Sequence, residues 1–167
     1  MNDSTDLTKR AIAMQALLAS QQTLLLSTAS ATGFPDMSYA PFVRDESGCF
    51  NILISELAAH TGNLMSNPHA SVMFIRPESE SSNLFARERV IFDCTVKEID
   101  RSDGGYSTQL MALQEQFGDI VGLLGSLSDF HLFALSPING RYVAGFGQAF
   151  TINLKDGSLS TLRKSHK

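Results

Sequence analysis

Cysteine, long apolar runs and an excess of positive charge are all scarce in this sequence of 167 residues. The two cysteines, Cys49 and Cys94, form no CxxC pair, which disfavours a redox or zinc motif and favours two buried structural thiols. No stretch approaches the roughly 18 uninterrupted apolar residues that a membrane helix needs. The opening run MNDSTDLTKR lacks the basic-then-apolar order of a signal peptide, so we expect a cytoplasmic protein without a membrane partner.

The overall charge argues against nucleic acid as a partner. A formal net charge of -4 leaves no basic surface of the kind that releases counterions from a phosphate backbone. With 43% hydrophobic and 18% charged residues, the chain has the composition of one globular domain with a core. We expect this domain to span residues 1–154, and the polar, aperiodic segment 155–167 to form a flexible basic tail.

Apolar residues at helical spacing predict three helices. One covers residues 7–20, with Asp6 as its N-cap. A second covers residues 56–66 and ends at Asn67-Pro68, because proline cannot continue the hydrogen-bond ladder. The third carries apolar residues at Tyr106, Leu110, Leu113 and Phe117.

Short apolar or alternating runs between turn residues predict strands, most of them joined by hairpin-length connections. The pair Asn139-Gly140 predicts a hairpin turn between the last two. Sequential strands with few crossover helices favour a mainly β (α+β) fold with a closed or nearly closed antiparallel barrel. The predicted strands cover residues 23–28, 36–44, 49–55, 70–75, 87–99, 130–135 and 141–152.

The run Gly145-Phe146-Gly147-Gln148-Ala149-Phe150 has a superficial likeness to the GxGxxG nucleotide motif. Phe150 stands where the third glycine would be, and we place the run inside a strand rather than between a strand and a helix. The sequence therefore predicts no nicotinamide site. Any electrons for redox chemistry would come from an external donor.

Several motifs along this order, considered together, resemble a known family. They are Gly33-x-Pro35, Asn63-Leu64 followed by Asn67-Pro68, NLFARERVIFDC, SDFHLFALSP and GRYVAGFGQAF. They resemble the FMN-binding split barrel of the pyridoxamine 5'-phosphate oxidase type and, over nearly the whole chain, its haem-utilisation HugZ/HutZ branch. The resemblance implies an antiparallel split β-barrel with a few flanking helices. It also implies a homodimer that holds haem in a cleft between protomers, degrades it oxidatively and releases the iron.

One segment departs from the flavin-binding members of this group. In those proteins a cation of an S-x-K or R-K pattern near the short helix holds the FMN phosphate, whereas this chain has Ala58-Ala59-His60-Thr61-Gly62. Without that cation, FMN binding is disfavoured. Two alternatives stay open: an FMN-dependent oxidoreductase of the pyridoxamine-phosphate-oxidase type, and a haem carrier or store without catalysis.

The resemblance assigns roles to two residues. It implies that His166, in the terminal run RKSHK, is the axial ligand of the haem iron, since a neutral imidazole nitrogen is a common iron ligand. By itself His166 would be an idle surface residue. The resemblance further implies that Asp129, placed at the start of the strand DFHLFAL, accepts a hydrogen bond from that histidine and strengthens its donation to iron. The alternative role for Asp129 is to cap the preceding segment.

Three more residues are candidates for cofactor binding. Arg87 and Arg89 lie two positions apart on a predicted strand and so share a face, where they could pair with the haem propionates. The alternative is a solvated strand edge. We expect His60, which replaces the flavin-binding cation, to line the same cleft. We interpret His131 as structural.

Overall fold

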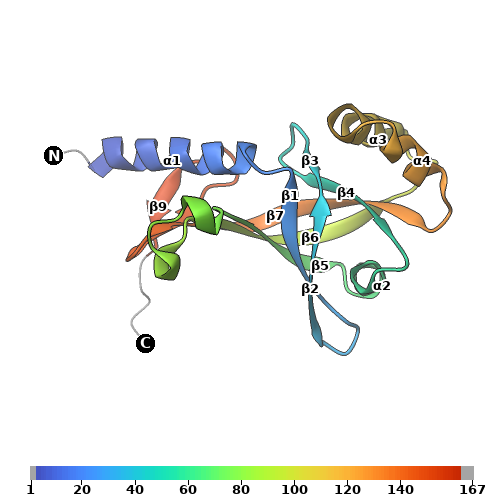
Figure 1. The fold of residues 1–167 in the computed structure, drawn as a ribbon, viewed down its shortest axis with the longest axis horizontal. Helices are drawn as coiled ribbons and strands as arrows, with labels where there is room; N and C mark the ends of the chain where they lie inside the picture. The colour runs from blue at the N-terminus through green and yellow to red at the C-terminus, as the bar shows by residue number, and fades with distance from the viewer. Residues whose placement is uncertain (1–2, 163–167) are drawn as a thin grey trace. The chain divides into compact units, whose positions relative to one another are not determined.

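The structure is a computed structural model that describes residues 3–162, so His166 lies outside the described residues. The chain folds into four α-helices, two 3-10 turns and nine strands within the described residues (Figure 1). The helices are α1 (Asp3–Ala19), α2 (Ala59–Ser66), α3 (Gly104–Phe117) and α4 (Ile120–Ser126), with 3-10 turns η1 (Glu78–Glu80) and η2 (Leu84–Ala86). The strands are β1 (Thr23–Ala29), β2 (Pro35–Pro41), β3 (Val43–Arg44), β4 (Phe50–Ser55), β5 (His69–Ile75), β6 (Arg89–Ile99), β7 (Phe130–Gly145), β8 (Gln148–Ile152) and β9 (Leu159–Thr161).

The strands pair in the order β2-β1-β5-β6-β7-β4-β3, and β8 joins β7 to β9. The pairs β1–β2, β3–β4, β4–β7, β7–β8 and β8–β9 are antiparallel. The predicted antiparallel, sheet-dominated α+β class is thus confirmed. Within residues 3–162, no helix has both the length and the apolarity needed to cross a membrane.

The chain divides into two compact units. The first contains the chain up to Gln21, residues 73–92 and the chain from Ile138 onward, and the second contains residues 22–72 and 93–137. The units are described separately below.

In the first unit, α1 lies beside β9 (Figure 1). The helix buries Met14, Leu17 and Leu18, so the apolar stripe predicted from the sequence does face the core. The predicted cap is wrong, because the helix begins at Asp3 and Asp6 therefore lies inside it. There the Asp6 carboxylate pairs with the guanidinium of Arg10, 2.8 Å away and one turn later.

The predicted hairpin at Asn139-Gly140 is wrong. Strand β7 continues through it, and the chain turns instead at Phe146-Gly147 between β7 and β8. Gly147 has a φ of 70°, the left-handed conformation that such a turn requires, whereas Gly140 does not have a positive φ. The run from Gly145 to Phe150 therefore contains a hairpin turn, with the end of β7 before it and the start of β8 after it, and is not the interior of one strand.

Gly140 is needed for close packing. A Cβ atom at this position would lie 2.9 Å from Cβ of Ile152 and 3.0 Å from Cε1 of Phe92, closer than side chains pack. A glycine in a strand interior often marks such a close approach. Gly140 was therefore interpreted as a turn residue, although glycine is needed here for close packing.

In the second unit, strands β1 to β4 supply apolar residues and α3 and α4 pack on each other (Figure 1). The third predicted helix is confirmed as α3, whose N-cap Asp103 accepts a hydrogen bond from the Gly105 N–H at 2.8 Å. A buried cluster joins these helices to β3 and β7. It consists of Val43, Tyr106, Leu113, Val121 and Leu132.

Other predicted boundaries differ from those observed. The predicted strand 36–44 is two strands, β2 and β3, with a break at Phe42, whose N–H donates to the carbonyl oxygen of Gln22. The helix predicted from residue 56 begins at Ala59. The predicted tail 155–167 contains strand β9, which pairs with β8, so its described part is not irregular throughout.

Candidate functional site

Asp129 precedes β7 by one residue and is half-buried in the second unit. Its Oδ2 accepts a hydrogen bond from the Ser55 hydroxyl at 2.9 Å, and its carbonyl oxygen accepts one from the Glu56 N–H at 2.8 Å. Its other carboxylate oxygen, Oδ1, has no donor among residues 3–162. The carboxylate is therefore fixed at one oxygen and open at the other, so it can accept a hydrogen bond from an incoming group.

Helix α2 is tied to its surroundings by the polar residues that surround His60 in the sequence. The Thr61 hydroxyl donates to the Ser55 carbonyl oxygen at 2.6 Å, and the Asn63 amide donates to the Thr28 hydroxyl at 3.0 Å. Asn63 thus has a structural task, since it anchors α2 to β1. Ser55 contacts both Asp129 and the first turn of α2, so these two parts of the candidate site share one anchoring residue.

His60 lies in the first turn of α2 with only 8% of its surface exposed. Burial lowers the pKa of its imidazole, and the Asp36 carboxylate opposes this effect only in part. His60 is therefore mostly neutral at pH 7 and does not supply the full positive charge that would pair with a flavin phosphate.

His131 belongs to the same region, although the sequence suggested only a structural role for it. Its Nδ1 lies 2.6 Å from Oε1 of Glu98 and its Nε2 lies 2.7 Å from Oε1 of Glu56. Burial alone would lower the pKa of His131, but the hydrogen bonds to Glu98 and Glu56 outweigh it and raise the pKa above its usual value.

The side chain of Arg101 holds the segment that leads to Asp129. The guanidinium of Arg101 donates to the carbonyl oxygens of Gly125, Leu127 and Phe130, at 2.5 Å for Gly125 and 3.2 Å for Phe130. Arg101 thereby caps the C-terminus of α4, whose last carbonyls lack partners within the helix. Asp129 lies between two of these fixed carbonyls, so its backbone is well held.

Arg87 and Arg89 belong to the first unit. Arg87 follows η2 and precedes β6, so the expectation that both arginines share one face of a strand is wrong. Its guanidinium donates to the Arg76 carbonyl oxygen at 2.7 and 3.1 Å and pairs with Glu78 at 3.2 Å. Arg89 donates to the Arg87 carbonyl oxygen and has no carboxylate partner among residues 3–162. Of the two, Arg89 has the charge still available for an anion.

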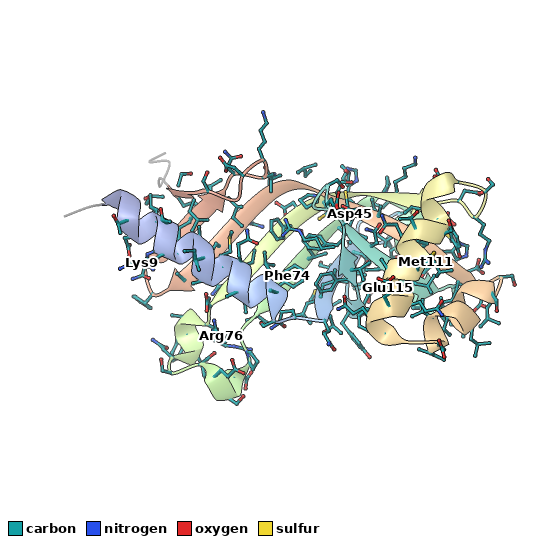
Figure 2. The ribbon with its side chains drawn as sticks, turned by 90° about the horizontal axis from the view of Figure 1, so that it is seen from above. Lys9, Asp45, Phe74, Arg76, Met111 and Glu115 are labelled. Carbon is teal, nitrogen blue, oxygen red and sulfur yellow. The ribbon has the colours of Figure 1, made fainter. Side chains whose placement is uncertain are left out.

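A polar pocket of about 270 Å³ adjoins Arg87 in the same unit. Figure 2 shows Arg76 at the base of the segment that carries η1 and η2, and this residue lines the pocket. Glu88, another lining residue, lies 2.7 Å from Nε of Arg76 and accepts a hydrogen bond from the Tyr142 hydroxyl. The positive charge of Arg76 is therefore already neutralised within the pocket wall.

The structure thus brings Asp129 and the helix of His60 together through Ser55, while Arg87 and Arg89 belong to the other unit. The predicted iron ligand His166 lies outside the described residues. Within residues 3–162, no group of three histidine, cysteine, aspartate or glutamate side chains is arranged to hold a bare metal ion.

Comparison with known proteins gives the class of this chain. Residues 11–144 match the profile of the pyridoxamine 5'-phosphate oxidase family, and the chain belongs to that family. Within the family, it is 42% identical over 136 residues to Heme oxygenase HutZ of Vibrio cholerae serotype O1. That match covers 81% of this chain and 77% of HutZ. The resemblance drawn from the sequence motifs is confirmed.

Solved structures give the same result. HutZ of Vibrio cholerae, described there as a heme storage protein, has a TM-score of 0.71 at 38% identity, covering 75% of this chain and 88% of HutZ. ChuZ of Campylobacter jejuni has a TM-score of 0.80 at 26% identity, covering 100% of this chain and 68% of ChuZ. The fold is thus the one that both of these proteins share.

Proposed function

We propose that this protein binds haem and degrades it oxidatively, with iron release and electrons from an external donor. The observation that carries the proposal is the half-buried Asp129 carboxylate, fixed at Oδ2 by Ser55 and open at Oδ1 among residues 3–162. The similarity to HutZ, which is named a heme oxygenase, supplies the class of ligand. The dimer cleft and the cytoplasmic location stay predictions from the sequence.

The residues present fit haem better than FMN. An imidazole ligand needs an acceptor for its second ring nitrogen, and the free oxygen of Asp129 can serve as one. Propionates need cations, and Arg89 is half-buried without a carboxylate partner within residues 3–162. A flavin phosphate needs a cation near α2, where this chain places the buried and mostly neutral His60.

We assign each residue a task on this basis. His166 binds the iron through one ring nitrogen, and Asp129 accepts the hydrogen bond from the other, which fixes the tautomer and strengthens donation. Ser55 and Arg101 hold Asp129 in place. The pairing of Arg89, which belongs to the other unit, with a propionate stays a prediction from the sequence. Bound haem would supply the iron centre at which oxygen is reduced, while the protein supplies the ligand, orientation and access.

A haem store without catalysis is the second candidate, because the solved structure of HutZ is described as that of a heme storage protein. The two functions differ in one measurement. A store keeps its Soret band when ascorbate and oxygen are added, whereas a degrading enzyme loses the band and releases iron that a chelator can detect.

Absorption titrations test the proposal directly. We expect hemin to bind at one equivalent per protomer with a Soret band at about 400 nm, and FMN to bind weakly. Hemin turnover with ascorbate should then release iron. Stoichiometric, tight FMN binding together with weak hemin binding would reject the proposal and favour the flavin oxidoreductase.

A further inference from the structure

The imidazole ring of His131 lies between two carboxylates, a position that bears on its protonation state. Both ring nitrogens lie within hydrogen-bond distance of carboxylate oxygens, 2.6 Å from Glu98 and 2.7 Å from Glu56. A neutral imidazole has one N–H donor and one lone pair, so it would direct that lone pair at a carboxylate oxygen. Only the imidazolium donates to both. Between two ionised carboxylates, the arrangement therefore favours a protonated ring.

The three residues come from three different elements. His131 lies on β7, Glu98 on β6, and Glu56 in the turn between β4 and α2. Strand pairing places Ile54 of β4 opposite His131, so the turn begins next to the ring. The imidazolium therefore joins two strands to the turn that leads into the helix of His60.

The same turn holds Asp129. The Ser55 hydroxyl donates a hydrogen bond to the Asp129 carboxylate, and the Glu56 N–H donates one to the Asp129 carbonyl oxygen. Of the two carboxylate partners of His131, Glu56 is the more exposed, with 55% of its side chain accessible against 45% for Glu98, and it lies in a turn rather than a strand. If His131 loses one of its two hydrogen bonds, we expect it to be the bond to Glu56. The turn that holds Asp129 would then become more mobile.

We propose that His131 is a positioning residue of the candidate site: held as an imidazolium between Glu56 and Glu98, it fixes the Ser55–Glu56 turn against Asp129, and loss of its proton loosens that turn. The inference rests on the proposed function only in that Asp129 orients the haem ligand. The coupling of His131 to the turn concerns the protein alone.

The direction of the pH effect follows from the charges around the ring. Glu56 and Glu98 face His131, Asp129 lies two residues earlier on the same segment with its carboxylate turned to Ser55, and the Arg101 guanidinium reaches the Phe130 carbonyl oxygen. The two facing carboxylates raise the pKa of His131 in the folded protein. Their stabilisation is complete below the ordinary histidine pKa of about 6.5 and is lost as the pH rises through the raised value.

The first test is an NMR titration of the haem-free protein that follows the histidine ring Cε1–Hε1 signals. The His131 signal, assigned by its disappearance in His131→Gln, should titrate above about 6.5. Glu98→Gln and Glu56→Gln should each lower that value by about one pH unit or more. Titration at or below the ordinary value, or no response to either variant, would overturn the proposal.

The second test measures hydrogen exchange of the Glu56 amide, which donates to Asp129. Its protection factor should fall several-fold as the pH passes the His131 pKa, and His131→Gln, which cannot titrate, should remove that pH dependence. The Val96 amide, which donates to Pro68, serves as the internal control. An unchanged Glu56 protection profile in His131→Gln would contradict the positioning role.

The third test asks whether the contact of His131 with Glu56 and Glu98 affects haem turnover. We expect the rate of hemin turnover by the wild type to fall at high pH, as His131 loses its proton. That fall should disappear in His131→Gln but persist in His69→Gln, a matched change at an exposed histidine. If hemin is not degraded at all, the proposed function fails while the NMR and exchange results still decide the role of His131. If hemin turns over with the same profile in wild type and His131→Gln, the positioning role is rejected.

Discussion

Among single residues, Asp129 and His166 carry the sharpest consequences of the proposed function. His166→Ala should abolish the native axial ligation and haem turnover while the fold survives, because the sequence predicts that the polar run RKSHK is a tail and surface substitutions usually change stability by less than about 0.5 kcal/mol. Asp129→Asn should leave the ligand in place but weaken its donation, so turnover falls more than binding. Resonance Raman or absorption spectra of the ferric complex, with turnover rates, measure both effects. An unchanged spectrum and rate in His166→Ala would mean that another residue binds the iron, with His60 the next to test.

Cys94 and Cys49 differ in a way that alkylation can detect. Cys94 is 1% exposed, and burial, aided by nearby Asp93 and Cys49, raises the pKa of its thiol to about 12. Roughly one Cys94 thiol in ten thousand is then ionised at pH 8, and the thiolate is the nucleophile. Iodoacetamide should therefore modify the half-buried Cys49 and spare Cys94 in the native protein. Mass spectrometry checks this, with both cysteines reacting in guanidinium as the control. Native labelling of Cys94 at the denatured rate would contradict the buried position.

The sequence could predict part of the candidate site at this scale. Asp129 and His60 were proposed from motifs whose residues are adjacent in the chain, and their roles in haem binding stay predictions. His131 was missed because Glu98 and Glu56 lie 33 and 75 positions away, and no periodicity within one element signals such a contact. The contact between His131 and Glu56 follows from the pairing of β7 with β4, because Glu56 comes directly after β4. The register of that pairing cannot be deduced from the sequence.

Among the elements, the Asn139-Gly140 error shows where local rules fail. Turn propensity and tight packing both select glycine, and only tertiary contacts distinguish them. Helices and strands with strong periodicity, such as α3 and β6, were predicted to within two residues or so. Helix α4 was not predicted, since it has only seven residues and is capped by the distant Arg101.

A pair of glycine substitutions tests this interpretation of Gly140. Gly140→Ala should destabilise the protein by about 1–3 kcal/mol, because the added methyl meets Ile152 and Phe92 at 3.0 Å or less. Gly62→Ala is the matched control: it lies in α2, is exposed and has nothing within 4 Å of a new Cβ. There alanine should stabilise by about 0.5–1 kcal/mol, since glycine is a poor helix former. Urea unfolding midpoints measure both, and equal effects of the same sign would contradict the packing role.

At the scale of the whole molecule, the antiparallel class and most of the order of strands and helices followed from patterning, because strands such as β1, β5 and β6 alternate between buried and more exposed residues. Val90 and Phe92 are buried as the alternation requires, with Ile91 half-buried between them. The division into two units could not be predicted. Strands β5, β6 and β7 each contribute residues to both units, and no linker in the sequence marks the boundary.

The prediction of a homodimer rests on the family resemblance and on strands with apolar residues on both faces, such as Val90-Ile91-Phe92. The outward face of β2 is a candidate for its interface. Met37 and Tyr39 are 63% and 64% exposed and lie two positions apart on a strand at one end of the sheet order, so a partner that covered this face would bury apolar surface. A second copy of the chain is the expected partner, because most soluble oligomers are symmetric homodimers.

Sedimentation at micromolar concentration should therefore give a dimer, and Met37→Asp should shift it toward monomer, because dimerisation would bury an unpaired carboxylate. Met111→Asp provides the matched control. Met111 is 62% exposed on α3 (Figure 2), away from β2 in sequence and in a different element, so the same change should leave the dimer intact. Far-UV circular dichroism confirms that both variants are folded. A monomeric wild type would reject the dimer, and equal dissociation of the two variants would reject β2 as its interface.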